Sequence, residues 1–212
     1  MPELQIIGGS ASNFVWVCRI VCAEKGVAYT LLPVMPHTQE VDAIHPLGKI
    51  PAMRHGDVTL CESRAICSYI DRVFPGPSLV PADPVAAART EQWISIVCTA
   101  VDPLFLRTYF AAYLFPGTPD GSPNRTAIDA AVPKMEPMFA MLDRAVAPTG
   151  HLVGSTFTLA DAYLLPILYY MRRNAESSAM LGKRAGLVAY LDRHLARPSV
   201  AGSIPTVPPG RR

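Results

Sequence analysis

His45-Pro46-Leu47-Gly48-Lys49-Ile50-Pro51 is followed, after a gap of ten residues, by Glu62-Ser63-Arg64-Ala65-Ile66. Pro51 enters a strand without a donor N–H, so the Ile50–Pro51 peptide can be cis. The N–H and C=O of Ile50 then face outward, where an extended peptide can pair with them. Ser63 opens a helix whose N-terminus suits a carboxylate, and Glu62 beside it can accept from an ammonium. Together these residues fit an amino-acid head group.

The surrounding residues predict a βαβ unit followed by a ββα unit. Apolar runs at 4–8 and 29–34 flank the stretch 14–24, whose apolar residues recur at helical spacing and which Gly26 ends. After Pro51, short runs at 52–54 and 58–61 flank the turn His55-Gly56-Asp57 and predict a hairpin. The stretch 63–73 then predicts a helix that begins at Ser63.

From Phe74 the composition changes to a linker rich in proline and glycine, and no comparable strand pattern follows it. Helices are predicted near 84–114, 124–146, 159–173 and 183–196, bent or interrupted at Pro103, Pro133 and Pro137, with an extended proline-rich tail. The predicted fold class is therefore α/β plus all-α. Its first domain is 1–75, its linker 76–84 and its all-helical second domain 85–212.

Composition excludes several classes of protein. The 212 residues are 50% hydrophobic, which excludes a disordered chain, and 19 Lys and Arg against 17 Asp and Glu form no block that could track nucleic acid. The longest stretch without a charged residue, 145–160, is shorter than the roughly 18 residues of a membrane helix, so no membrane partner is expected. The N-terminus lacks the pattern of a secretory signal, which predicts a cytoplasmic protein. Five cysteines without a Cys-x-x-Cys pair predict neither a disulfide framework nor a metal site.

Taken together, the chain resembles the cytosolic glutathione transferases, of the bacterial kind with a serine in the active site. The motifs that carry the resemblance are Gly48-Lys49-Ile50-Pro51, Glu62-Ser63-Arg64-Ala65-Ile66, the stretch Arg19–Gly26, and the capping segment Phe157-Thr158-Leu159-Ala160-Asp161. In the last of these, Thr158 and Asp161 are expected to form a capping box. The resemblance implies a thioredoxin-like first domain, an all-helical second domain and a homodimer. It further implies an enzyme that conjugates glutathione, its co-substrate, to a hydrophobic electrophile without a metal, a detoxification reaction.

The resemblance also assigns roles to residues of the first domain. Ser12, seven residues before Arg19, takes the catalytic position, where its hydroxyl would stabilise the glutathione thiolate. Ser12 is equally suited to cap the first helix, as are Ser10 and Asn13, and Ser10 remains the alternative for catalysis because Asn13 stands where many serine-type members have proline. The residues implied to bind glutathione are Lys49, Ile50, Pro51, Glu62, Ser63 and His37. Lys49 and His37 would face the glycyl carboxylate, whereas His45 is expected only to cap or end a helix.

The electrophile is expected between the domains, near Phe14, Phe105, Tyr109 and Tyr113. The last three recur every four residues, a spacing that lines one helix face and also suits an ordinary core stripe. A tyrosine hydroxyl there could polarise an acceptor. Because these residue types also build cores, the sequence does not identify the electrophile. A glutathione-dependent isomerase or dehalogenase, or a non-catalytic glutathione-binding carrier of the same fold, remains an alternative.

Overall fold

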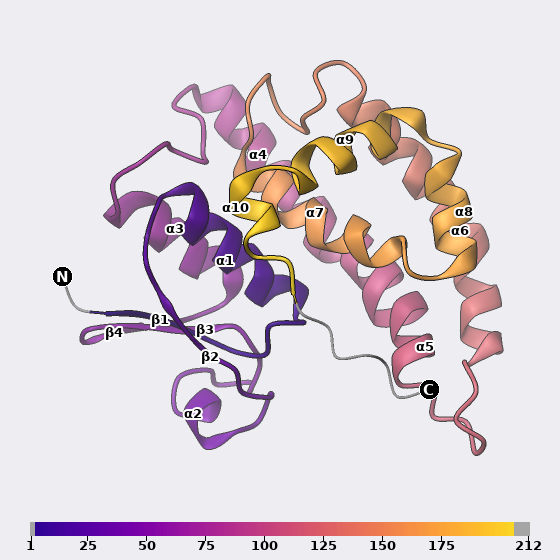
Figure 1. Ribbon diagram of the computed structural model, residues 1–212, viewed down its shortest axis with the longest axis horizontal. Helices are drawn as coiled ribbons and strands as arrows, with labels where there is room; N and C mark the ends of the chain where they lie inside the picture. The colour runs from indigo at the N-terminus through magenta and orange to yellow at the C-terminus, as the bar shows by residue number, and fades with distance from the viewer. Residues whose placement is uncertain (1–2, 206–212) are drawn as a thin grey trace. The chain divides into compact units, whose positions relative to one another are not determined.

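The computed structural model describes residues 3–205 and divides the chain into two compact units (Figure 1). The first unit contains the chain up to Leu79 together with the stretch that begins at Ala196. The second unit is Val80–Leu195. The division falls inside the predicted linker, but the stretch from Ala196 belongs to the first unit and not, as predicted, to the helical domain.

The first unit has the predicted βαβ-ββα order. Its elements are β1 (Leu4–Ile7), α1 (Asn13–Glu24), β2 (Thr30–Leu32), α2 (Gln39–Asp42), β3 (Ala52–His55), β4 (Val58–Cys61) and α3 (Ser63–Val73). The sheet has the order β2-β1-β3-β4, in which β1 is parallel to β2 and antiparallel to β3, and β3 is antiparallel to β4. This mixed sheet with its helices has the expected thioredoxin-like arrangement. Two short helices of this unit are additional to the predicted order: α2 and, near the end of the described chain, α10 (Pro198–Ala201).

The two faces of this sheet are covered by different helices. Figure 1 shows α1 and α3 on one face and α2 on the other. Ile7 and Ala52 pack with Val41 of α2 in one buried cluster. Successive residues of a strand point to opposite faces, so the buried neighbours Ile6 and Met53 face the α1 and α3 side. Burial on both faces explains why Leu4, Ile6 and Ile7 of β1 are all apolar, with only the partly buried Gln5 between them.

The end of the described chain packs on α1 and corrects the predicted domain boundary. Glu24 accepts hydrogen bonds from Arg197 Nε and Nη2, at 3.0 and 2.9 Å, and from the Ser199 hydroxyl. The buried indole N–H of Trp16 donates to Ser203 Oγ at 3.0 Å. A buried indole N–H needs such a hydrogen-bond partner. The proline-rich sequence of this part of the chain predicted an extended tail and gave no sign of this contact. Pro198–Ala201 forms the short helix α10 rather than an extended tail, and the part of the predicted tail after residue 205 lies outside the described residues.

The second unit is all-helical, as predicted. Its elements are α4 (Pro84–Ile96), η1 (Val97–Val101), η2 (Pro103–Phe110), α5 (Ala111–Leu114), α6 (Arg125–Val146), α7 (Leu159–Met171), α8 (Ala175–Gly182) and α9 (Ala185–Leu195). Residues 84–114 form one helical stretch, in which η1 and η2 are π-helical and Pro103 begins η2. Pro133 and Pro137 lie inside α6 without ending it, and α8 was not predicted.

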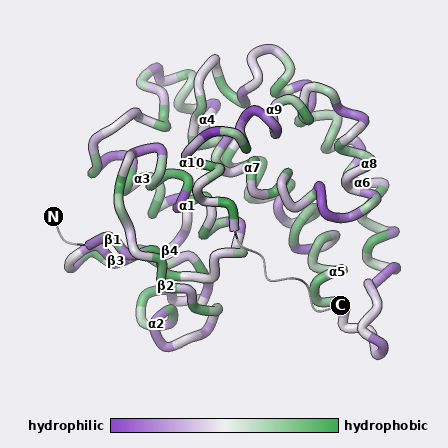
Figure 2. The backbone as a smooth tube through the Cα atoms, viewed as in Figure 1, coloured by the Kyte–Doolittle hydropathy of each residue, from purple (hydrophilic) through white to green (hydrophobic). Residues whose placement is uncertain are grey.

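The helix α7 forms the centre of this unit. Nearly all of its residues are buried, and its hydrophobic character can be followed in Figure 2. At its start, Thr158 and Asp161 form the predicted capping box. The buried Asp161 carboxylate also accepts from Leu152 N at 2.9 Å and from the Tyr190 hydroxyl at 3.0 Å. Hydrogen bonds to a charged group contribute about 1.5 to 3 kcal/mol each, so this side chain ties α7 to the preceding loop and to α9.

Pro84–Leu114 is long and apolar enough, by length and composition, to cross a membrane. Its residues Val97, Val101 and Phe105 are fully buried inside the protein, as in the core helix of a globular domain. The stretch is not free of charge, because Arg89, Glu91, Asp102 and Arg107 interrupt it. Asp102, between η1 and η2, and Arg107 of η2 form an ion pair, with Arg107 Nε 2.9 Å from Asp102 Oδ2.

Candidate glutathione site

The sheet register brings the predicted glutathione-binding segments to one end of the sheet. Ile7 at the end of β1 pairs with Leu32 of β2 and with Ala52 at the start of β3. Ala52 pairs in turn with Cys61, the last residue of β4. The segments that carry Ser12, His37, Lys49–Pro51 and Glu62–Ser63 therefore all enter or leave the sheet at this end.

Gly8 allows two of these segments to approach each other closely. Its φ is +145°, and its N–H donates to Leu32 O at 2.9 Å. A Cβ at this position would lie 2.7 Å from Val15 Cγ2 and 2.9 Å from Ile50 Cβ, closer than carbon atoms pack. The start of α1 and the residue before Pro51 therefore both contact Gly8, where there is room for a hydrogen atom but not for a side chain. The Ile50–Pro51 peptide bond is cis, as predicted.

Of Ser10, Ser12 and Asn13, the three candidates for the cap, Ser12 is the N-cap of α1. Its Oγ accepts from Val15 N at 3.4 Å, and its own N–H donates to Gly9 O at 3.0 Å. A serine that caps a helix uses an oxygen lone pair, so its hydroxyl proton can still be donated to an anion. Capping and thiolate stabilisation are therefore compatible in one half-buried side chain.

His37 lies against the loop that carries Lys49. The His37 N–H donates to Gly48 O at 2.9 Å, and both residues have a φ of +60°. A Cβ on Gly48 would lie 2.1 Å from His37 Nδ1, so glycine is required for this contact. The His37 side chain is 72% exposed, with Nδ1 3.8 Å from Asp42 Oδ1, and Lys49 is also exposed. Both side chains are thus exposed, on two loops that a backbone hydrogen bond joins.

Glu62 and Ser63 form the turn from β4 into α3. Glu62 has a φ of +68°, its carbonyl accepts from Ile66 N at 3.0 Å, and Ser63 is the buried first residue of the helix. The Glu62 carboxylate is exposed, and its Oε1 lies 3.6 Å from Nε2 of the buried His45. This contact was not predicted from the sequence, in which His45 was expected only to cap or end a helix.

The candidates for the electrophile pocket differ in burial. Phe105 is fully buried and packs on Phe139 with a ring-centroid distance of 4.7 Å. Tyr109 is fully buried as well. Burial assigns both side chains to the core of the helical unit, the other use that their spacing suits. Tyr113 and Phe14 are half-buried, and an electrophile-binding role for them stays a prediction.

Glu176 of α8 engages both tyrosine hydroxyls. Tyr113 donates to Glu176 Oε2 at 2.5 Å and Tyr109 donates to the same atom at 3.1 Å, while Arg125 donates to Oε1 at 2.7 Å. These hydrogen bonds, the one from Tyr113 above all, lower the pKa of Glu176 to about 2. The carboxylate therefore stays charged. The Tyr113 hydroxyl would have to break its hydrogen bond to Glu176 before it could polarise an acceptor.

The buried cysteines lie between α1 and α3. Cys18, Cys22 and Cys67 are fully buried, and the Cys67 thiol donates to Cys18 Sγ at 3.8 Å. Burial raises the pKa of the Cys18 and Cys22 thiols well above the ordinary value, which disfavours the reactive thiolate. Among residues 3–205, no three His, Cys, Asp or Glu side chains come together as a metal site.

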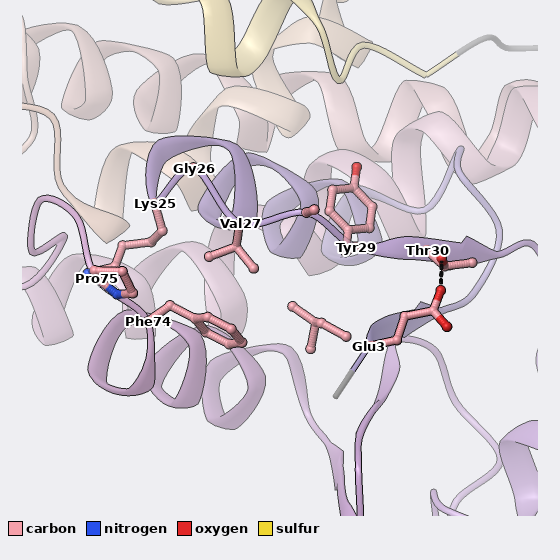
Figure 3. Close-up of a pocket in the computed structure, with 10 residues that line it drawn as sticks. Glu3, Lys25, Gly26, Val27, Tyr29, Thr30, Phe74 and Pro75 are labelled. Carbon is pink, nitrogen blue, oxygen red and sulfur yellow. Dashed lines mark hydrogen bonds between the residues drawn. The ribbon is translucent and has the colours of Figure 1, made fainter. Parts of the chain in front are cut away.

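A cavity of about 410 Å³ lies at the opposite end of β1 and α1 (Figure 3). Leu4, Val27, Phe74 and Pro75 form its apolar wall. Lys25 lines it too, but its ammonium is turned to the Asp71 carboxylate at 3.3 Å and donates to the carbonyls of Asp71, Gly76 and Pro77. The predicted glutathione-binding residues do not line this cavity.

Known proteins resemble the chain over both units. Family models for the glutathione S-transferase N-terminal and C-terminal domains match residues 7–78 and 125–197. Glutathione S-transferase 3 of Zea mays is 29% identical, over 98% of this chain and 96% of that protein. A stringent starvation protein A homolog of Haemophilus ducreyi is 26% identical, over 88% and 82%. The crystal structure of the theta class glutathione S-transferase from Xanthomonas axonopodis pv. citri, with glutathione bound, has a TM-score of 0.83 at 26% identity and covers 98% of this chain and 99% of its own.

The close approach at Gly8 predicts an unequal response to alanine at two glycines of the first unit. Gly8→Ala should lower the free energy of unfolding by about 2 to 4 kcal/mol, because backbone strain and overpacking add. Gly26→Ala, at a φ of +66° with no atom within 4 Å of the new Cβ, should cost about 1 kcal/mol. Urea unfolding of both variants measures the difference, and equal losses would contradict the close approach.

Proposed function

Because the chain belongs to the cytosolic glutathione S-transferase family, we propose that it binds glutathione at the end of the sheet described above and transfers the thiolate to a hydrophobic electrophile. The observation that carries this proposal is the convergence of Ser12, Ile50 and the Glu62–Ser63 turn at that end. Each segment offers the type of group that one part of the tripeptide requires.

The charged groups at the two ends of glutathione need different partners in the site. Glu62 accepts from the ammonium of the γ-glutamyl residue, and the N-terminus of the eleven-residue α3, with Ser63, holds the carboxylate beside it. Lys49 and His37 lie where they can attract the glycyl carboxylate. The backbone of Ile50 pairs with the cysteinyl residue between them. This arrangement leaves the thiol facing the start of α1.

Ser12 stabilises the thiolate in this proposal. A cysteine-like thiol has a pKa of about 8.5 and is largely protonated at neutral pH, so a donor aimed at sulfur favours the nucleophilic form. The Ser12 hydroxyl and the positive end of the α1 dipole supply that stabilisation. Serine cannot form a mixed disulfide with glutathione, which favours transfer to an electrophile over thiol–disulfide exchange.

A homodimer is part of the proposal. Val58 at the hairpin and Val73 at the end of α3 are 39% and 47% exposed, apolar surface that a second copy could cover. Sedimentation at micromolar concentration should give twice the 22.9 kDa chain mass, and Val73→Glu should shift the distribution toward the monomer. A monomer in the unaltered protein would contradict the proposal.

Removal of the polar partners in the turn should weaken glutathione binding. Glu62→Gln and Ser63→Ala should each reduce the binding free energy by about 1 to 3 kcal/mol, the cost of losing a hydrogen bond to a charged group. Isothermal titration with glutathione measures the change, with Asp57→Asn, an exposed acid at the other end of the hairpin, as the control. Unchanged affinity in both turn variants would remove the turn from the site.

Loss of the Ser12 hydroxyl should change the chemistry more than the affinity. Ser12→Ala should raise the pKa of the bound glutathione thiol and lower turnover by roughly ten- to a thousandfold, the range for a lost charge-stabilising donor. The pH dependence of thiolate absorbance in the binary complex measures this pKa. Ser12→Gly, which weakens the helix cap by only a few tenths of a kcal/mol, should behave alike.

Ser10→Ala is the matched control for this experiment. A shift of the thiol pKa seen only in Ser10→Ala would move the catalytic role to Ser10, and no shift in any variant would refute a serine-stabilised thiolate. Analysis of the products from candidate electrophiles separates conjugation from isomerisation and dehalogenation, since glutathione is consumed in conjugation and returned unchanged by an isomerase.

A further inference from the structure

His45 is held rigidly in the loop between α2 and β3. Its N–H donates to Val41 O at 2.7 Å, its carbonyl accepts from Gly48 N at 2.9 Å, and its side chain is 3% exposed. Nδ1 accepts from the Leu47 N–H at 3.1 Å. Since Nδ1 is an acceptor, the proton of the neutral imidazole is on Nε2.

The protonated side of this ring faces the Glu62 carboxylate. Nε2 lies 3.6 Å from Glu62 Oε1, longer than a hydrogen bond and close enough for an electrostatic contact. Glu62 is on a separate turn, and its side chain is 68% exposed. An exposed glutamate otherwise populates several rotamers, and ordering it on ligand binding costs conformational entropy. A fixed donor beside one oxygen reduces that cost and leaves the outer surface of the carboxylate open to solvent.

The contact joins the two halves of the proposed site. The loop of His45 continues directly into Gly48, Lys49 and Ile50, whereas Glu62 begins the turn into α3. We propose that His45 is a positioning residue: its Nε2–H holds the Glu62 carboxylate in the orientation that receives the ammonium of glutathione. This inference rests on the proposed function, and it assigns to His45 a share in selecting ligands with a free γ-glutamyl ammonium.

The test compares glutathione with N-acetylglutathione, which lacks the ammonium, by isothermal titration. His45→Asn keeps an acceptor near Nδ1 for Leu47 and removes the Nε2–H, so it should weaken glutathione binding about three- to tenfold and change N-acetylglutathione binding by less than about twofold. His45→Gln places an amide N–H near the position of Nε2 and should recover most of the loss. In a Glu62→Gln background, His45→Asn should cause no further loss, because the pair acts as one unit.

Other outcomes overturn the proposal in distinguishable ways. Equal weakening of both ligands, or a further loss in the Glu62→Gln background, would assign His45 to loop structure alone and leave the glutathione site intact. Failure of the unaltered protein to bind glutathione would overturn the proposed function and this inference with it. Should His45→Asn not fold, the imidazole ¹⁵N spectrum of the unaltered histidine decides: Glu62→Gln should shift the Nε2 resonance, and an unshifted resonance would refute the contact.

Discussion

The close approach at Gly8 is the constraint on which the proposed site depends. The end of β1, the first turn of α1 and the residue before Pro51 meet there, and the gap between them holds a hydrogen atom but no methyl group. Through this contact Ser12 and Ile50 come to the same end of the sheet, although they are 38 positions apart in the chain. The hydrogen bond from Gly8 N to Leu32 O extends the same junction to β2.

Backbone geometry, more than side-chain burial, organises the groups around this junction. His37, Gly48 and Glu62 all have positive φ, and each is held by a backbone hydrogen bond: His37 to Gly48, Gly48 to His45, and Glu62 to Ile66. The charged side chains of Lys49 and Glu62 remain exposed, where an ion pair by itself contributes little. The proposed recognition of glutathione therefore relies on groups that would be ordered before the ligand arrives: two helix N-termini, the peptide beside Pro51, and the Glu62 carboxylate that we propose His45 orients.

The helical unit uses carboxylates in two different ways. Asp161 is fully buried and satisfies four donors around the start of α7, so its role is structural. Glu176 is partly exposed and accepts hydrogen bonds from Tyr109, Tyr113 and Arg125, which come from different helices. The hydroxyls of both tyrosines are therefore bound by Glu176. Among Phe105, Tyr109 and Tyr113 of η2 and α5, only Tyr113 is partly exposed.

Local sequence patterns were sufficient for the long elements, the hairpin, the cis peptide and the capping box, because periodicity, turn residues and caps act over a few positions. They did not reveal α2, α8 or α10, since helices this short do not form alone and are stabilised by tertiary packing. Motif spacing likewise indicated Glu62 and Ser63, but not the partner of Glu62. The contacts of His45 with Glu62 and of Tyr113 with Glu176 join segments 17 and 63 positions apart, and only the folded chain brings such side chains together.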